Sequence, residues 1–266
     1  MGFIRSWRRR RQLARTPLDP ALWQRVACGL PFLRGLATEE LARLRELSLL
    51  FLSDKEMHAA GGLELSDEMR LSIAVQACLP VLNLGLEWYQ GWIGVIVYPG
   101  EFRVHKEEAD AHGVVHSIDA DLSGEAWPGG PVVLSWRDAN SAQAGYNVVI
   151  HEFAHKLHML RGDDEGFPEP PAGVDAAAWR GDLEQAYTRF CAQVDSGIPT
   201  IIDAYAAEHP AEFFAVTSET FFTDSGILAR DYRELYQRLA QFYRQDPAGV
   251  LASLDSEGGN GERTEE

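Results

Sequence analysis

The chain has 266 residues, of which 45% are hydrophobic and 24% are charged, so it can bury a substantial core. Its formal net charge is −16 and its pI is near 4.9. This charge excludes a direct nucleic-acid binder without a large basic face, because phosphates would be repelled. The three cysteines lie far apart and form no C-x-x-C pair. We therefore expect buried free thiols in a reducing, cytoplasmic compartment rather than disulfides or a structural zinc site.

The N-terminal residues 1–18 are rich in arginine and predict a flexible basic arm. No uninterrupted apolar segment follows these arginines, so we expect no signal peptide. The longest apolar region, Leu71–Tyr98, is broken by polar residues and a proline, and it predicts no membrane span. At the other end, residues 253–266 are polar and predict a disordered tail.

Three helices are predicted before the first strand, at Pro20–Ala27, Thr38–Leu52 and Ser66–Leu82, from apolar residues at helical spacing. Ile93–Tyr98 is a β-branched and aromatic run closed by Pro-Gly, which predicts a strand. Phe102–His105 and Val114–Ile118 are candidate partner strands. A turn at Trp127–Gly130 precedes another predicted strand at Pro131–Trp136. As an edge strand, Pro131–Trp136 would bind a peptide backbone by strand addition, but an ordinary sheet strand explains the pattern equally well.

The next predicted helix carries the pattern H-E-x-x-H as His151, Glu152 and His155. Residues four apart share one face of a helix, so both imidazoles can bind one zinc ion. The glutamate between them then lies close enough to take a proton from a water that the metal polarises. A helix with two surface histidines remains the alternative. His158 lies on the same face but two turns from His151, which suits a position beside the ligands better than a ligand role.

A hydrolytic zinc takes three protein ligands, and two glutamates are candidates for the third. Glu212 follows Pro210, which fits the first turn of a helix, and the helix after it is apolar nearly all round. A buried carboxylate there needs a cation or a metal. Glu219, seven residues on, shares that face, so it could be the ligand instead or could orient one. Asp175 is a predicted helix N-cap, and helices are expected at 176–195, 210–222 and 227–245.

These motifs resemble the Mlc titration factor A family of bacterial zinc peptidases. The stretches that carry the resemblance are His151–Leu157, Asp203–Ala207, Pro210–Glu219 and Gln241–Pro247. The family is similar in its catalytic core to anthrax lethal factor, a gluzincin-type arrangement. Predicted helices before and after a small sheet make the fold α+β. The resemblance implies a mostly helical fold with a small mixed sheet beside the H-E-x-x-H helix. It also implies a single zincin-like domain over residues 19–252.

Carried over to this chain, the resemblance implies one Zn²⁺ held by His151, His155 and Glu212, with Glu152 as general base. It further implies that Tyr205 assists catalysis, with Asp203 two residues earlier as a candidate for orienting that segment or a ligand. His158 is a departure, because an acidic residue is expected there. The implied function is hydrolysis of peptides, of aminopeptidase type on short peptides, in a protein linked to the sugar-uptake repressor Mlc.

A different class of function stays open beside the peptidase: a non-catalytic regulator that sequesters a transcriptional repressor. The aromatic residues of the last helix would suit a partner surface, and the acidic body would suit a basic DNA-binding partner. Those residues are Tyr232, Tyr236, Phe242 and Tyr243. The same spacing also describes a helix that packs in the core.

Overall fold

A computed structural model describes residues 18–109, 115–141, 143–161 and 166–250. The predicted arm at 1–18, apart from Leu18, and the predicted tail at 253–266 lie outside the described residues. The α-helices are α2 (Pro20–Gly29), α3 (Thr38–Asp54), α4 (Asp67–Cys78), α5 (Trp136–Ala139), α6 (Val148–Arg161), α7 (Ala176–Asp195), α8 (Pro210–Thr223), α9 (Ser225–Asp231) and α10 (Arg233–Tyr243). Short 3₁₀ turns are η1 (Pro31–Leu33), η2 (Leu86–Tyr89) and η3 (Ala204–Ala207).

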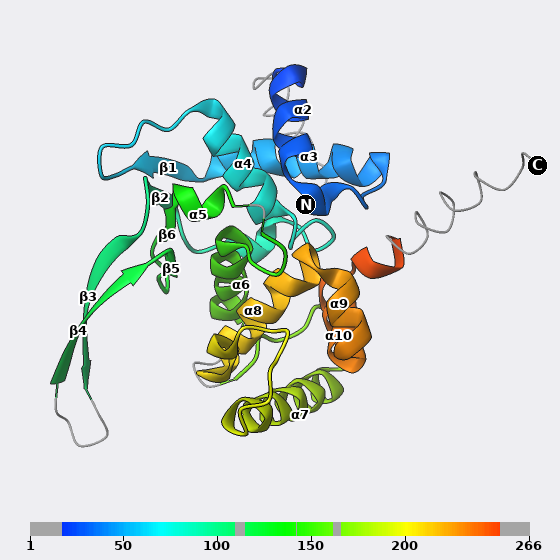
Figure 1. Ribbon diagram of the computed structural model, residues 1–266. Helices are drawn as coiled ribbons and strands as arrows, with labels where there is room; N and C mark the ends of the chain where they lie inside the picture. The colour runs from blue at the N-terminus through cyan, green and yellow to red at the C-terminus, as the bar shows by residue number, and fades with distance from the viewer. Residues whose placement is uncertain (1–17, 110–114, 142, 162–165, 251–266) are drawn as a thin grey trace, which may run out of the picture.

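The main sheet has four strands in the order β1-β2-β6-β5, in which β5 alone runs antiparallel to its neighbour. These strands are β1 (Glu56–Ala59), β2 (Gly94–Tyr98), β6 (Val132–Ser135) and β5 (Gly124–Ala126). The fold is therefore α+β and mostly helical, with a small mixed sheet, as predicted. In Figure 1 the sheet stands to one side of α6, and α8 lies on the other side of that helix.

One strand pairing is predicted wrongly. The segments expected to pair with β2 instead pair with each other, as β3 (Phe102–Ala109) and β4 (Val115–Leu122). They form an antiparallel ribbon that projects from the body in Figure 1. The predicted strand Pro131–Trp136 is β6, and of the two alternatives for it the ordinary sheet strand is correct. It is an inner strand between β2 and β5, and its four residues are all buried. The edge next to α6 is β5, which the pattern did not reveal.

Helix starts follow the predicted caps closely. The Asp175 carboxylate accepts hydrogen bonds from the amides of Ala177 and Ala178, and α7 begins at the next residue. Pro210 occupies the first turn of α8, where its missing N–H costs nothing. The helix predicted over 227–245 is in fact two, because the backbone leaves the helical conformation at Tyr232.

One hydrophobic cluster extends from Val26 near the start of the described chain to Tyr243 near its end. Tyr236, Phe242 and Tyr243 belong to it and are buried, so they are core residues and not the partner surface that one interpretation of the sequence offered. Tyr243 packs on Phe214 of α8, which joins the last helix to the centre of the fold. Among the described residues, no helix combines the length and hydropathy required to span a bilayer.

The three cysteines are free, but they are not all buried as expected. Cys28 is exposed, Cys191 is half-buried and Cys78 is fully buried in the core. Burial raises the pKa of the Cys78 thiol well above its usual range, so little nucleophilic thiolate forms there near neutral pH.

We expect Cys28 to react rapidly with a disulfide reagent at pH 8, and Cys78 to react only after the chain unfolds. Counting released chromophore against time, in native buffer and then in guanidinium, measures this. The Cys28→Ser variant should lose the fast phase and keep the slow one. A slow phase that disappears in Cys28→Ser would contradict its assignment to Cys78.

Candidate metal centre

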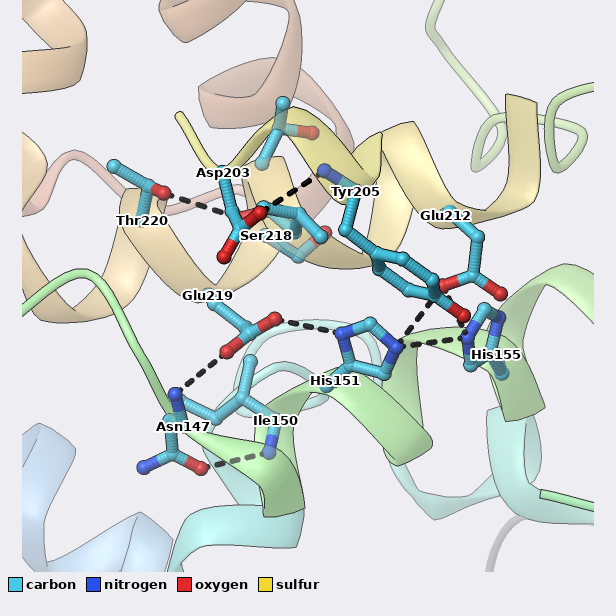
Figure 2. Close-up of polar contacts among 12 residues, drawn as sticks. Asn147, Ile150, His151, His155, Asp203, Tyr205, Glu212, Ser218, Glu219 and Thr220 are labelled. Carbon is cyan, nitrogen blue, oxygen red and sulfur yellow. Dashed lines mark hydrogen bonds and ion pairs between the residues drawn. The ribbon is translucent and has the colours of Figure 1, made fainter. Parts of the chain in front are cut away.

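Helix α6 presents His151 and His155 on one face, one helical turn apart. Their Nε2 atoms lie 3.1 Å from each other and their ring centroids 4.7 Å apart. The preceding residues Val148, Val149 and Ile150 are buried in the core, which fixes the rotation of the helix. Both imidazoles therefore direct a ring nitrogen to the same point in a cleft, as Figure 2 shows.

The first turn of α8 brings Glu212 to that same point. Its Oε2 lies 3.2 Å from Nε2 of His151 and 3.4 Å from Nε2 of His155. This oxygen is buried and has no well-formed hydrogen bond among the described residues. Burial raises the pKa of the Glu212 carboxyl, but the two facing imidazoles outweigh burial and hold that pKa well below its usual range.

The three donor atoms fit a metal ion. One atom each from His151, His155 and Glu212 lies within 4.8 Å of the others. A buried carboxylate oxygen without a hydrogen-bond donor, opposite two ring nitrogens, is costly unless a cation shares the space. Two imidazoles and one carboxylate match the three-ligand sets of hydrolytic metal sites. These side chains therefore could hold one metal ion.

Glu219 has a different place from Glu212, although both come from α8. Its Oε1 lies 2.6 Å from Nδ1 of His151, and its Oε2 accepts the backbone N–H of Asn147 at 2.6 Å. A carboxylate at Nδ1 keeps the proton on that nitrogen and leaves the Nε2 lone pair for a metal. Burial lowers the pKa of His151, but Glu219 and then Glu212 outweigh it and raise that pKa well above its usual value. The site thus strongly attracts positive charge.

Asn147 and Gln76 support this arrangement, and sequence reasoning missed both. The Asn147 side-chain oxygen accepts the amide of Ile150 at 2.9 Å and so caps α6. Its amide nitrogen donates to Oε1 of Gln76 at 2.7 Å, and Gln76 donates in turn to the carbonyl of Ala139. Asn147 immediately before an apolar run is a cap signal that could have been found. Gln76 is one of the polar residues that interrupt the apolar segment Leu71–Tyr98, and that position alone gives no signal of its contact with Asn147.

Glu152 lies between the two histidines in sequence and is buried. Burial raises the pKa of its carboxyl, although His151 and His155 act in the opposite direction. It lines a cleft of about 850 Å³ together with both imidazoles and the strand β5. Gly124 of β5 lies so close that an added Cβ would overlap the Glu152 side chain and lie 2.7 Å from a methyl group of Val148. The edge of the sheet and this carboxylate are therefore in direct contact.

Tyr205 stands on the turn η3, across the cleft from α6. Asp203 caps this turn by accepting the Tyr205 amide at 2.9 Å, so the aspartate holds the segment and does not reach a histidine. The Tyr205 ring centroid is 6.5 Å from that of His151, and Figure 2 shows the phenol extending toward Glu212 and His155. Burial, followed by the Glu212 charge, raises the pKa of Tyr205. The phenol therefore stays protonated and can donate a hydrogen bond.

His158 is outside the three-donor cluster. Its Nε2 donates to the carbonyl of Gly166 at 2.8 Å, which ties the end of α6 to the segment beyond it. The side chain is buried and contributes to one wall of the cleft. His158, the departure from the family pattern, thus makes a hydrogen bond that connects two segments of the fold.

Together, the H-E-x-x-H helix, the small sheet beside it and the two-histidine, one-glutamate donor set have the arrangement of a zincin-like metallopeptidase core. The family described as glucose-regulated metallo-peptidase M90 matches residues 4–244. Relatives called Mlc titration factor A, from Salmonella typhi and Salmonella typhimurium (strain LT2), are each 41% identical over 244 residues. The match covers 90% of this chain and 92% of each relative. The chain belongs to this metallopeptidase family.

Proposed function

We propose that the chain is a zinc-dependent peptidase, with His151, His155 and Glu212 as the ligands of one Zn²⁺. The observation that carries the proposal is the convergence of these three donors, next to a buried glutamate, in an open cleft. Nitrogen and oxygen donors of this kind suit zinc in a catalytic site with one open position. Bound zinc would supply Lewis-acid polarisation of a water and of the scissile carbonyl.

Glu152 acts as the general base and then as the general acid. Its carboxylate accepts a proton from the attacking water and passes it to the leaving amine. Burial raises the pKa of the Glu152 carboxyl, which makes its carboxylate a better proton acceptor for this role. The phenol of Tyr205, which stays protonated, donates a hydrogen bond to the oxyanion that develops on the substrate carbonyl.

The substrate backbone binds along β5. Among the described strands, β5 pairs with β6 alone, and it lines the cleft and contacts Glu152 through Gly124. An extended peptide that adds to this edge gains backbone hydrogen bonds irrespective of its sequence. The absence of a side chain at position 124 lets the peptide backbone approach the catalytic carboxylate closely.

We infer aminopeptidase-type activity on short peptides. Among the described residues that line the cleft there are five carboxylates and no lysine or arginine. They are Glu125, Glu152, Asp203, Glu212 and Glu219. Beside the groups engaged around the proposed metal, Glu125 and Asp203 remain to attract a free substrate ammonium, and no lysine or arginine of the described lining repels it. Free cysteines suit a reducing cytoplasm as the compartment.

The first experiment is to strip the purified protein of metal, reconstitute it with zinc and measure bound zinc and hydrolysis of aminoacyl and short-peptide anilides. We expect one zinc per chain and cleavage that a chelator abolishes. N-acetylated substrates should be cleaved much more slowly than those with a free amine. Zinc without cleavage would reject the peptidase, and equal rates on acetylated substrates would reject only the aminopeptidase preference.

The relatives' name, Mlc titration factor A, favours a second proposal: this chain binds the repressor Mlc. Sequestration of a partner needs no general base, so Glu152→Gln separates the two functions. Calorimetric titration of purified Mlc into the wild type and into Glu152→Gln should give the same affinity if binding is independent of hydrolysis. No measurable heat with either protein would reject the Mlc proposal and leave the peptidase untouched.

A further inference from the structure

Two buried lysines contact the indole ring of one residue, Trp92. The ammonium of Lys55 lies 4.3 Å from the ring centroid of Trp92, and that of Lys156 lies 5.0 Å from it. Both residues are less than a tenth exposed. Burying an ammonium is costly unless its three N–H groups find acceptors, so each must have a structural reason. The two lysines have different acceptors.

Lys156 donates to the carbonyl of Trp127 at 2.6 Å and to the carbonyl of Gly130 at 2.9 Å, while its remaining side faces Trp92. It belongs to α6, directly after His155 and one turn beyond Glu152. Trp127 and Gly130 belong to the turn that joins β5 to β6. The Lys156 ammonium therefore joins α6 to the turn of the β5–β6 hairpin. In that hairpin, β5 is the edge strand of the described sheet.

Strand β6 is buried and paired with β2, whereas the β5 side of the hairpin has little apolar burial of its own. Its edge strand β5 is three residues long, and the ring of Trp127 is 47% exposed, so apolar burial holds that end weakly. The turn closes on itself through Gly130 N–H to Trp127 C=O at 3.0 Å and Trp127 N–H to Pro131 C=O at 3.1 Å. At the other end of β5, Gly124 rests against Glu152. Strand β5 thus contacts α6 at its start, where Gly124 lies against Glu152. Beyond its end, the Lys156 ammonium joins α6 to the hairpin turn.

We propose that Lys156 is a positioning residue, which sets the distance between the edge strand β5 and the catalytic helix and thereby holds a bound peptide backbone against Glu152. The inference rests on the proposed peptidase function and on binding of substrate along β5. It assigns to Lys156 no contact with substrate or metal. Its ammonium also interacts electrostatically with Glu152, and its positioning effect passes through the carbonyls of Trp127 and Gly130.

Lys55 provides a matched control. It is equally buried and contacts the same indole, but it donates to the carbonyls of Tyr89 and Trp92 and pairs with Asp54 at 3.2 Å. It lies between α3 and β1, and β1 is the opposite edge of the sheet from β5. A merely structural role for a buried ammonium would make the two lysines equivalent.

The test compares Lys156→Met with Lys55→Met, since methionine keeps most of the apolar stem and removes all three donors. Zinc content, thermal midpoint, kcat and KM are measured with one short-peptide substrate. We expect both variants to lose thermal stability and to keep their zinc. Lys156→Met should raise KM about tenfold or more with kcat changed far less, and Lys55→Met should leave KM near the wild-type value. An unchanged KM in Lys156→Met, or equal increases in both variants, would overturn the proposal.

A second measurement keeps the inference testable if the chain hydrolyses nothing. Amide hydrogen exchange in the β5–β6 hairpin, residues 124–133, is followed in the zinc-reconstituted wild type and both variants. We expect faster exchange there in Lys156→Met alone, since the hairpin has lost its attachment to α6. Unchanged exchange in that segment would reject the attachment of the hairpin to α6 through Lys156. Faster exchange without any peptidase activity in the wild type would instead reject the proposed function and retain the attachment.

Discussion

Glu152→Gln is expected to lower kcat/KM for peptide hydrolysis by roughly 10²- to 10⁴-fold, the usual contribution of a positioned general base. Glutamine has the same shape but accepts no proton from the attacking water. The side chain is buried and its pKa is raised, so a neutral isostere costs little stability. Zinc content and the thermal midpoint should therefore stay close to those of the wild type.

The measurement is kcat/KM on one free-amine substrate, with metal analysis of the same samples. Glu184→Gln is a suitable control, because Glu184 is an exposed carboxylate on α7 that does not line the cleft and has no place in the mechanism. It should keep nearly full activity. Full zinc content together with undiminished hydrolysis in Glu152→Gln would remove Glu152 from the role of base.

The second large effect is expected at the third ligand. Glu212→Gln should weaken zinc binding by more than about 100-fold, because it replaces the charged oxygen that faces both Nε2 atoms. Glu219→Gln should weaken it by roughly 10- to 100-fold, the usual range for a group that orients a ligand. Its carboxylate contacts Nδ1 of His151, on the side of the ring away from the metal position.

Competition with a chromophoric chelator of known affinity measures both constants. Circular dichroism of the metal-free proteins serves as the control for folding. Glu219→Gln needs it most, because its carboxylate also accepts the amide of Asn147 at the start of α6. The reverse ranking of the two affinities would mean that Glu219 is the ligand and Glu212 the supporting group.

The local features of this fold were predictable from the sequence. Asp175 and Pro210 mark helix starts through backbone chemistry that needs no distant partner, and α7 and α8 begin where they indicate. The four-residue spacing of His151 and His155 likewise requires only a helix. The pattern left Glu212 and Glu219 as alternatives, since both lie on one face of α8. The orientation of α8 against α6 is what places Glu212 at Nε2 of His151 and Glu219 at its Nδ1.

Features that depend on long-range packing could not be predicted. Strand β5 consists of Gly124, Glu125 and Ala126, none of which favours a strand, and it exists because β6 pairs with it. The sequence therefore offered only β6 as a candidate for the edge strand, with an ordinary sheet strand as the equal alternative. Lys156 in a helix predicts a solvent-exposed side chain, yet it is buried because two carbonyls from a distant turn accept its protons. Such acceptors have no signature in local sequence.

The donors of the candidate centre come from α6 and α8, and all of α7 lies between these two helices in the chain. An ion held by both would close that long stretch into a loop, so metal supply would govern how much of the protein persists in the cell as well as its chemistry. Free metal at a hundred times the dissociation constant would add about 2.7 kcal/mol to the unfolding free energy. A metal-starved cell would then hold fewer intact copies, because the unliganded chain opens more often to degradation.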